Sequence, residues 1–521
     1  MHYTRLSVNL VAVLALPTFA LPTNPIDKRA DNHTLNRERA DAVKAAFQHA
    51  WNGYKTYAFP HDELHPASNS FSDSRNGWGA SAIDAFSTAC VMQLPDVVNT
   101  ILDYIPTIDF NTTTEQVSLF ETTIRYLGGM LSGYDFLKGP LSNLAANATA
   151  VDEVLKQAQR LANNLAYAFD TPTGIPSNNL IFPNSTDGST TNGLATIGSL
   201  VLEWTHLSDL TGDQTYAQLS QKGESYLLAP QPASSEPWPG LVGTNVDLKT
   251  GLFQDASGGW VGGDDSFYEY LMKMYVYDSA KYSDYKDRWI LAADSSIAHL
   301  ASHPSTRPDV TFLAEFEGQT RIFQSEHLAC FDGGSFILGG LALNEQKYTD
   351  FGLALVNGCH DTYVSTATGI GPEVFQWVEN STSPTDPNNP PPPADQEAFY
   401  NKSGFYITAS DYVLRPEYLE SVYYAYRATG DQMYRDWSWD AFLAINNTCA
   451  VGSGYAELNN VNVPGGGGFN DFMDSFFFAE VLKYAYLTQA PDNVWQVDNQ
   501  GANQWVFNTE AHPFKVNGPP V

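Results

Sequence analysis

The sequence is short of cysteine and of charged residues for its length. Only 4 of its 521 residues are cysteine, so disulfides cannot form the main framework, and a large core must supply most of the stability. Charged residues make up 16 % of the chain, against roughly 25 % in average globular domains, whereas aromatic residues reach 13 %. This composition suits a large core and a neutral, polyhydroxylated ligand.

Basic residues are also scarce. The chain has 27 Lys and Arg against 58 Asp and Glu, a formal net charge of −31, and such a surface repels nucleic acid and anionic membranes. After its N-terminal segment the sequence has no run of roughly 20 apolar residues, which a membrane-spanning helix needs. We therefore expect no nucleic-acid partner and no membrane span in the mature chain. Nothing in the sequence demands an oligomer, and we expect a monomer.

The first 20 residues have the pattern of a secretory signal peptide. A basic residue precedes the apolar run VNLVAVLALPTFA, which ends in a small-residue stop at 18–20. The dibasic pair Lys28-Arg29 is a second processing site, so the mature chain begins either after residue 20 or at Ala30. Seven N-glycosylation triplets agree with a protein that is secreted or resident in the secretory-pathway lumen. They begin at Asn32, Asn111, Asn147, Asn184, Asn380, Asn401 and Asn446.

Helical periodicity dominates the rest of the chain. The phrase TGDQ-x-Y occurs at 211–216 and at 429–434, each time between two helical patterns, so that a glycine stops one helix before the next begins. This unit predicts an all-α toroid of helical hairpins with short β-hairpins and loops. A toroid grows by adding hairpins, and we expect a single domain over residues 35–513. The clearest helical patterns are 37–58, 148–169, 194–212, 265–278, 416–430 and 474–488.

One helical stretch, SLFETTIRYLGGMLSGYDF at 118–136, combines an apolar stripe with a carboxylate and a guanidinium. Glu121 and Arg125 stand four residues apart and could form a purely structural ion pair. Glu121 could equally be one of the two carboxyl groups that glycoside hydrolysis requires. The small residues Gly128, Gly129 and Ser132 continue the same face, which favours a stripe that faces a ligand.

Three further acidic residues stand at helical positions. Asp265 begins a helix, and Ser266 with Glu269 forms an S-x-x-E capping box, so by itself this segment favours helix capping. Glu417 stands in the first turn of another helix, where acidic residues ordinarily complement the helix dipole. Glu480 lies mid-helix among phenylalanines, where an unpaired carboxylate is costly. A buried Arg, Lys, metal or ligand hydroxyl must therefore pair with Glu480.

The segment HDELH at 61–65 has two histidines four residues apart, as some zinc sites do. Pro60 and Pro66 bracket it and argue against a continuous helix, and the order of residues is not that of the H-E-x-x-H zinc motif. We therefore do not expect a metal site there. The serine-hydrolase motif G-x-S-x-G is absent from the sequence.

Six segments together resemble glycoside hydrolase family 47, and in particular its secreted fungal α-1,2-mannosidases. In chain order they are FETTIRYLGG, DDSFYEYL, HLACF, LRPEYLES, DSFFFAEVLKYAYL and FNTEAHPF. The resemblance runs from about residue 35 to His512. It implies an (α/α)7 barrel and a calcium-dependent, inverting exo-hydrolase that removes α-1,2-linked mannose from high-mannose N-glycans. The alternative is a mannose-binding quality-control lectin on the same fold, which would have lost one of the acids or the calcium-binding threonine.

The resemblance also assigns roles to residues. Glu121 matches the general acid, Asp265 a second carboxylate that acts as acid or positions water, and Glu417 the general base. Inversion requires room for a water between base and sugar, with carboxyl groups roughly 6.5 to 9.5 Å apart. Thr509 matches the residue whose hydroxyl and carbonyl bind Ca²⁺, a hard cation that prefers oxygen ligands. Further matches in the sugar-binding cleft and around the ion are Arg125, Glu63, His327, Arg415, Phe476, Glu480, Glu420 and Glu510.

Two other features follow from the same resemblance. Cys330 and Cys359 match the disulfide of the family, whereas Cys90 and Cys449 have no general counterpart, and their pairing stays open. Members that remove a single mannose in the endoplasmic reticulum carry arginine two residues before the position of Asp265. This chain has Gly263 there, which favours the broader, Golgi-type specificity.

Overall fold

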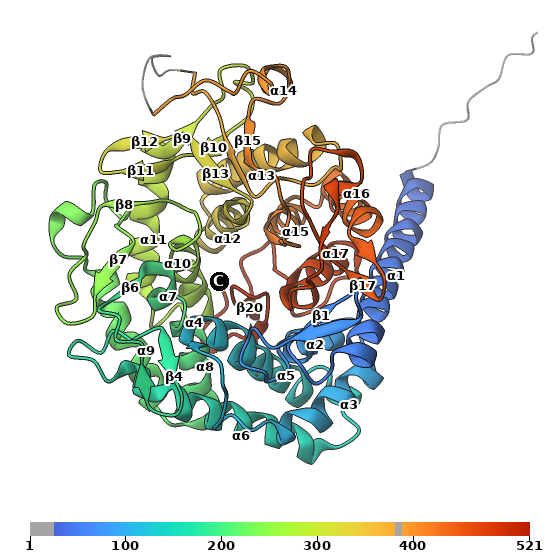
Figure 1. The fold of residues 1–521 in the computed structure, drawn as a ribbon, viewed down its shortest axis with the longest axis vertical. Coiled ribbons are helices and arrows are strands. Elements are labelled where there is room, and N and C mark those ends of the chain that lie inside the picture. Colours follow the sequence, from blue (N-terminus) through green and yellow to red (C-terminus); the bar gives the residue numbers. More distant parts are fainter. Residues whose placement is uncertain (1–24, 381–387) are drawn as a thin grey trace, which may run out of the picture.

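The computed structural model describes residues 25–380 and 388–521, with the side chains of 25–33 left undescribed, and the predicted signal peptide at 1–20 lies outside these residues. Within the described residues, helices form two concentric rings (Figure 1). Seven inner helices contact their neighbours in a closed circle. They are α2 (Ala80–Val91), α5 (Gly128–Lys138), α8 (Val201–Thr211), α10 (Asp265–Tyr277), α12 (Asp332–Leu343), α15 (Glu417–Thr429) and α17 (Leu482–Gln489).

Each inner helix packs against an outer helix that is next to it in the chain or, for α17, against the first helix. The predicted toroid of helical hairpins is therefore confirmed, and the first and last helices close it. In the order of their inner partners, the outer helices are α3 (Pro95–Tyr104), α6 (Ala148–Leu165), α9 (Thr215–Leu228), α11 (Ser283–Ser295), α13 (Gln346–Ser365), α16 (Gln432–Thr448) and α1 (Pro25–Tyr57). The short helices α4 (Leu119–Thr122), α7 (Leu194–Gly198) and α14 (Glu397–Ser403) complete the set.

Composition explains which helices lie inside. Every residue of α2 is buried, as expected for a helix covered on all sides. The outer helix α6 instead buries one stripe, including Val151, Val154, Ala158 and Leu161, and exposes its other face. The two TGDQ phrases act as predicted, because Gly212 (φ 77°) ends α8 and Gly430 (φ 68°) ends α15 in the left-handed conformation.

Helices α2 and α5 approach closely, which explains the small residues that follow Glu121. A Cβ on Gly129 would lie 2.7 Å from the carbonyl oxygen of Ile83, and one on Gly128 would lie 2.7 Å from Nδ2 of Asn508. Ser132 donates to the carbonyl of Pro513 at 2.7 Å. The interpretation of these residues as a ligand-facing stripe is wrong, because they contact neighbouring backbone and side chains instead.

In the described residues the β-structure consists of short antiparallel sheets of two or three strands in the segments between helices. The C-terminal hairpin β20 (Trp505–Phe507) and β21 (Pro513–Lys515) packs on α10 and α5, and β20 lies near the middle of the ring (Figure 1). Its turn carries Thr509 into the barrel. The other strands are β1 (63–65), β2 (70–72), β3 (117–118), β4 (179–181), β5 (185–186), β6 (191–193), β7 (245–247), β8 (257–258), β9 (301–302), β10 (312–313), β11 (315–317), β12 (320–322), β13 (324–326), β14 (374–376), β15 (406–409), β16 (450–451), β17 (454–455), β18 (457–458) and β19 (469–470).

The cysteines divide into one pair and two free thiols. Cys330, before α12, is bonded to Cys359 in α13, so the predicted disulfide is confirmed. Cys90 and Cys449 are buried and unpaired. Among the described residues, every helix is too short or too polar to cross a membrane.

Candidate active site

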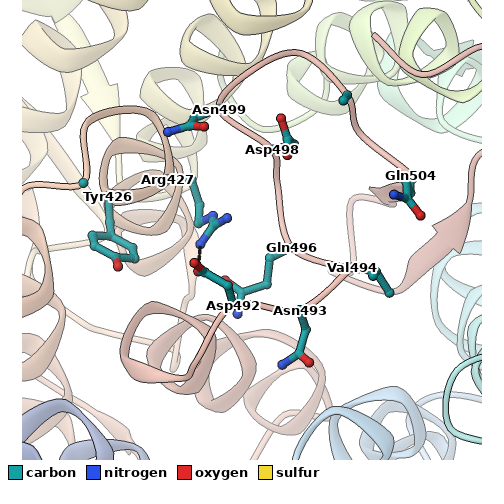
Figure 2. A pocket seen from close by; sticks show the side chains of 11 residues that line it. Tyr426, Arg427, Asp492, Asn493, Val494, Gln496, Asp498, Asn499 and Gln504 are labelled. Atoms are coloured by element: carbon teal, nitrogen blue, oxygen red, sulfur yellow. Dashed lines mark hydrogen bonds and ion pairs between the residues drawn. The ribbon is translucent and has the colours of Figure 1, made fainter. Parts of the chain in front are cut away.

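Two cavities lie at different ends of α15. The first, of about 530 Å³, surrounds the end of α15 and the segment that follows α17. There Arg427 is ion-paired with Asp492 at 2.5 Å, and amide side chains surround the pair (Figure 2). The second, of about 340 Å³, includes Glu417 at the first residue of α15. Ten residues of helix, about 15 Å, separate Glu417 from Arg427.

The chemistry gathers in the second cavity, which we call the barrel cavity. Nine of the predicted site residues line it, namely Glu121, Arg125, Asp265, Arg415, Glu417, Phe476, Glu480, Thr509 and Glu510. Glu420 lines a narrow extension of it, together with Glu269. They come from the inner helices α10 and α15, from the segments just before α5, α15 and α17, and from the C-terminal hairpin, so that only the closed ring brings them together. The first cavity holds no comparable set of buried carboxyl groups.

Glu121 is held between two guanidinium groups. Nε of Arg125 donates to its Oε2 at 2.8 Å, and Nε of Arg75 lies 3.8 Å from the same oxygen. These arginines lower the pKa of Glu121, although burial and the charge of Asp84 oppose them. The helix also changes here, because Thr123–Leu127 form a π-helical turn, a feature that is frequent at functional sites.

Arg125 connects Glu121 to the rest of the site. Its Nη1 donates to Glu510 and to Ser475, the latter at 3.2 Å, and lies 3.5 Å from Oδ2 of Asp84. Its guanidinium carbon stands 5.5 Å from the ring centre of Phe476. The guanidinium is therefore fixed by several acceptors and cannot follow Glu121 if that side chain moves.

Asp265 is a carboxyl group that retains its proton more readily than usual. Burial, and then the nearby charges of Glu326, Glu269 and Glu417, raise its pKa to about 7. Its Oδ1 accepts from the backbone N–H of Ser266 at 2.7 Å, at the start of α10. This backbone bond lowers the pKa but does not offset burial.

The alternative of a capping box at this helix start is wrong. The structure places the N-cap at Asp264, one residue before the helix, rather than at Ser266. The hydroxyl of Ser266 accepts from Ser199 at 2.7 Å, and Glu269 is ion-paired with Lys273. The contact with Ser199, which follows the short helix α7, and the ion pair within α10 thus outweigh the local capping preference.

Glu417 lines the barrel cavity and its extension from the N-terminus of α15. Burial raises its pKa to about 7, against the lowering effect of the Arg415 guanidinium, whose Nη1 lies 3.9 Å from Oε1. Nδ1 of His327 lies 3.1 Å from Oε2. Arg415 itself is fixed by Glu373, which accepts from its Nε at 2.5 Å. Leu414, which precedes Arg415, has a φ of 64°. Left-handed backbone at a non-glycine residue is energetically costly and concentrates at functional sites.

Comparisons with known proteins agree with this arrangement of acids. The sequence model described as glycosyl hydrolase family 47 matches residues 46–516. The chain belongs to this family.

Relatives of the chain are also enzymes of that family's kind. A probable mannosyl-oligosaccharide alpha-1,2-mannosidase 1B from Aspergillus clavatus is 58 % identical over 517 residues, which cover 98 % of this chain and 99 % of the relative. A mannosyl-oligosaccharide alpha-1,2-mannosidase from Penicillium citrinum is 58 % identical over 482 residues, 92 % of each chain. The solved structure of an alpha-1,2-mannosidase from Trichoderma reesei superimposes with a TM-score of 0.90 at 56 % identity, covering 92 % of this chain and 99 % of that one.

These comparisons confirm the predicted fold and decide between the enzyme and the lectin. The close structural match confirms the (α/α)7 barrel, which the two rings of seven helices already show. The protein is a glycosidase, and the lectin alternative loses its support.

The floor of this family 47 site holds several buried carboxyl groups. Burial raises the pKa of Glu420, Glu480 and Glu510, and the charges of neighbouring carboxylates add to that rise. Glu480 sits in a second π-helical turn, Phe477–Val481. Lys483, whose pKa burial lowers to about 7, acts on Glu480 only through its charge, because its Nζ donates to the carbonyl of Ala511.

Thr509 lies beside these carboxyl groups, at the turn of the C-terminal hairpin. It lines both the barrel cavity and its extension, and its N–H donates to Tyr270 at 3.2 Å. The turn is held by Ala511, whose φ of 54° is left-handed. Among the described residues, no three His, Cys, Asp or Glu side chains form a metal-binding cluster. A cation at this place would thus rely on Thr509 oxygens, water and sugar rather than on a carboxylate cage.

Glu63 does not reach the barrel cavity. Its carboxylate accepts from Ser72 at 2.9 Å and from the hydroxyl and N–H of Ser74 at 2.6 and 3.1 Å, and it is fully buried. The cavity lining does not include it. In this structure Glu63 shapes the loop after β2 rather than contacting the sugar space.

Sequence reasoning missed three charged residues at the site, Arg75, Asp84 and Asp474. Asp84 had a readable signal, because it is a carboxylate inside the otherwise apolar helix ASAIDAF, and the structure pairs it with Arg125 and His512. Arg75 and Asp474 had none, because each meets its partner only through the tertiary fold.

Proposed function

We propose that the protein hydrolyses terminal α-1,2-linked mannose from high-mannose N-glycans with inversion of configuration. The observation that carries this proposal is that Glu121, Asp265 and Glu417, from three different parts of the ring, line one cavity with Thr509. Two of these carboxyl groups have a pKa of about 7, as a general acid and base need. The names of the relatives supply the substrate class.

Glu417 is the proposed base. His327 donates to Oε2, so Oε1 is the oxygen that accepts a proton from water. The oxygen of that water forms a bond to the anomeric carbon as the glycosidic bond on the opposite side breaks, and the product is released as β-mannose. Arg415 beside Oε1 favours the ionised form that this step needs.

The leaving oxygen must receive a proton in the same step. Glu121 carries two guanidinium contacts, which favour its anion, whereas buried Asp265 favours its protonated form. We therefore assign the proton to Asp265, directly or through water, in place of the sequence-based assignment to Glu121. Glu121 then orients the leaving group and stabilises the positive charge that develops on the sugar ring.

Calcium fits the floor of this site. Burial and neighbouring carboxylates raise the pKa of several carboxyl groups there, and a hard cation would favour their ionised forms while accepting oxygen ligands. Thr509 would hold Ca²⁺, and the ion would supply a fixed positive charge that binds sugar hydroxyls. The planar ring of Phe476 offers a surface on which a sugar ring stacks.

The proposed setting is the secretory pathway. Five sequon asparagines, Asn111, Asn147, Asn184, Asn380 and Asn401, are exposed on the surface and open to glycosylation. The disulfide agrees with an oxidising compartment. Residues 35–513 would act there as one catalytic domain.

Proton NMR of the hydrolysis of α-1,2-mannobiose tests the function. β-Mannose should form first and equilibrate later with the α-anomer, and a calcium chelator should stop the release. Initial α-mannose would contradict inversion, and release that is indifferent to the chelator would contradict the role of calcium. No release by the calcium-loaded protein would contradict the substrate assignment.

A further inference from the structure

A short loop brings an additional arginine to the reacting carboxylates. The loop joins β2 to α2 and is organised by the buried carboxylate of Asp62, which accepts from the N–H groups of Arg75, Gly77 and Gly79 at 2.9, 2.6 and 2.8 Å. The hydroxyl of Tyr126 donates both to Asp62 and to the carbonyl of Arg75. The backbone of Arg75 is thereby fixed at both its N–H and its C=O.

The shape of this loop depends on left-handed backbone. Asn76, Gly77 and Gly79 have φ values of 82°, 74° and 77°, which glycine and asparagine adopt at low cost. A Cβ on Gly79 would lie 2.7 Å from the hydroxyl of Tyr104. These residues therefore permit the left-handed backbone of the loop, and the Asp62 and Tyr126 hydrogen bonds hold the conformation that directs Arg75 toward Glu121.

The side chain of Arg75 completes a ring of alternating charges. Its Nε lies 3.8 Å from Oε2 of Glu121, and its Nη2 lies 3.6 Å from Oδ2 of Asp474. Arg125 contacts the same two carboxylates, Glu121 at 2.8 Å and Asp474 at 3.8 Å. Each carboxylate thus stands between two guanidinium groups. The side chain of Arg75 is 28 % exposed and that of Arg125 is 6 % exposed, so Arg75 is the solvent-side member.

We propose that Arg75 is a positioning residue of the reaction, which acts through Glu121 by holding its carboxylate against Arg125. The inference rests on the proposed function. Without Arg75, Glu121 would keep one guanidinium partner and gain freedom to rotate, since its own side chain is 29 % exposed. Misplacement of a catalytic group by about 1 Å costs on the order of 100-fold in rate.

The charge environment of Glu121 gives the test its specificity. Arg125 on its own helical segment and Arg75 on the loop lower its pKa, and Asp84 of α2 raises it. Asp474 and Glu510 act on it through the shared Arg125. Removing Arg75 raises the pKa of Glu121, whereas a purely structural defect would lower the rate at every pH alike.

The experiment compares Arg75→Gln and Arg75→Lys with the wild type on α-1,2-mannobiose. For Arg75→Gln we expect kcat/KM to fall about tenfold, below the 100-fold limit for misplaced groups because one guanidinium remains. We also expect activity to fall more steeply at acidic pH, below the ionisation of Glu417 near 7, because Glu121 without Arg75 is protonated more readily there. Arg75→Lys should restore part of the rate. The control is Arg39→Gln, an ion-paired arginine between α1 and α16, which should leave both rate and profile unchanged.

A double-mutant cycle with Glu121→Gln decides whether Arg75 acts through Glu121. In the Glu121→Gln background, Arg75→Gln should lower kcat/KM only slightly further, because the carboxylate that Arg75 positions is already absent. The proposal would be overturned if Arg75→Gln lowered kcat/KM about tenfold in the Glu121→Gln background as well, or if Arg75→Gln alone did not lower it. Thermal unfolding checks folding, which should persist because Asp62 and Tyr126 bind only the backbone of residue 75. A wild type that releases no mannose would instead refute the proposed function.

Discussion

Nδ1 of His327 lies 3.1 Å from Oε2 of Glu417, and Nε2 of the same ring lies 2.8 Å from the hydroxyl of Tyr363. Burial lowers the pKa of His327 to about 4, so the imidazole is neutral at higher pH and carries one proton. A carboxylate accepts and a tyrosine hydroxyl can donate, which places that proton on Nδ1. The neutral histidine therefore fixes Glu417 by a hydrogen bond to Oε2 and leaves Oε1 of Glu417 free to accept a proton from water.

Replacing the base should abolish turnover and spare the fold. Glu417→Gln retains the acceptor for His327 and the size of the side chain but cannot take a proton from water. We expect kcat to fall by about 10² to 10⁴, the usual worth of general base catalysis. The thermal unfolding midpoint should stay at or above the wild-type value, because a neutral amide removes a buried charge. Mannose release close to the wild-type rate would refute the role of Glu417.

The pH profile should identify the proton donor. Activity needs Glu417 ionised and Asp265 protonated, so it should decline on both sides of pH about 7, with apparent pKa values that belong to the coupled pair. Asp265→Asn should remove the fall on the basic side and leave the fall on the acidic side. If Glu121→Gln instead removed the fall on the basic side and Asp265→Asn retained it, Glu121 would be the proton donor.

Calcium should stabilise the fold more at alkaline than at acidic pH. Glu420, Glu480 and Glu510 have raised pKa values, so their contribution to stability is present below the unfolded-state pKa and is lost as pH rises through the folded-state pKa. A bound cation offsets that loss. The calcium-dependent rise in unfolding temperature should be larger at about pH 8 than at about pH 5. An equal rise in unfolding temperature at both pH values would show that calcium does not interact with these carboxyl groups.

The glycines of α5 should be needed for packing rather than for sugar binding. A Cβ on Gly133 would lie 2.1 Å from the ring of Phe86, so Gly133→Ala should destabilise the protein by about 1 to 3 kcal/mol. Gly223→Ala in α9 is the matched control, because its nearest contact would be an ordinary 3.4 Å. Denaturant unfolding measures both. Equal stability of the two variants would contradict the tight contact between α2 and α5.

Local patterns in the sequence determined much of the architecture. Three-to-four spacing located the helices, and Gly212 and Gly430 ended α8 and α15 where the TGDQ phrases predicted, because these preferences depend on neighbouring residues alone. The six motifs added the family, the acids and the disulfide, since their order in the chain is itself information. Most of the predicted site residues consequently line the barrel cavity.

Only the tertiary structure decided which local signals prevailed. Ser266 contacts Ser199, after α7, instead of forming a capping box. The small residues after Glu121 contact neighbouring backbone and side chains instead of sugar, and Glu63 binds the loop after β2. Arg75 reaches Glu121 across 46 positions of sequence, and no spacing rule spans that distance. Closing the ring places residues from distant helices within a few ångströms in a low dielectric, where charge and packing outweigh local propensity.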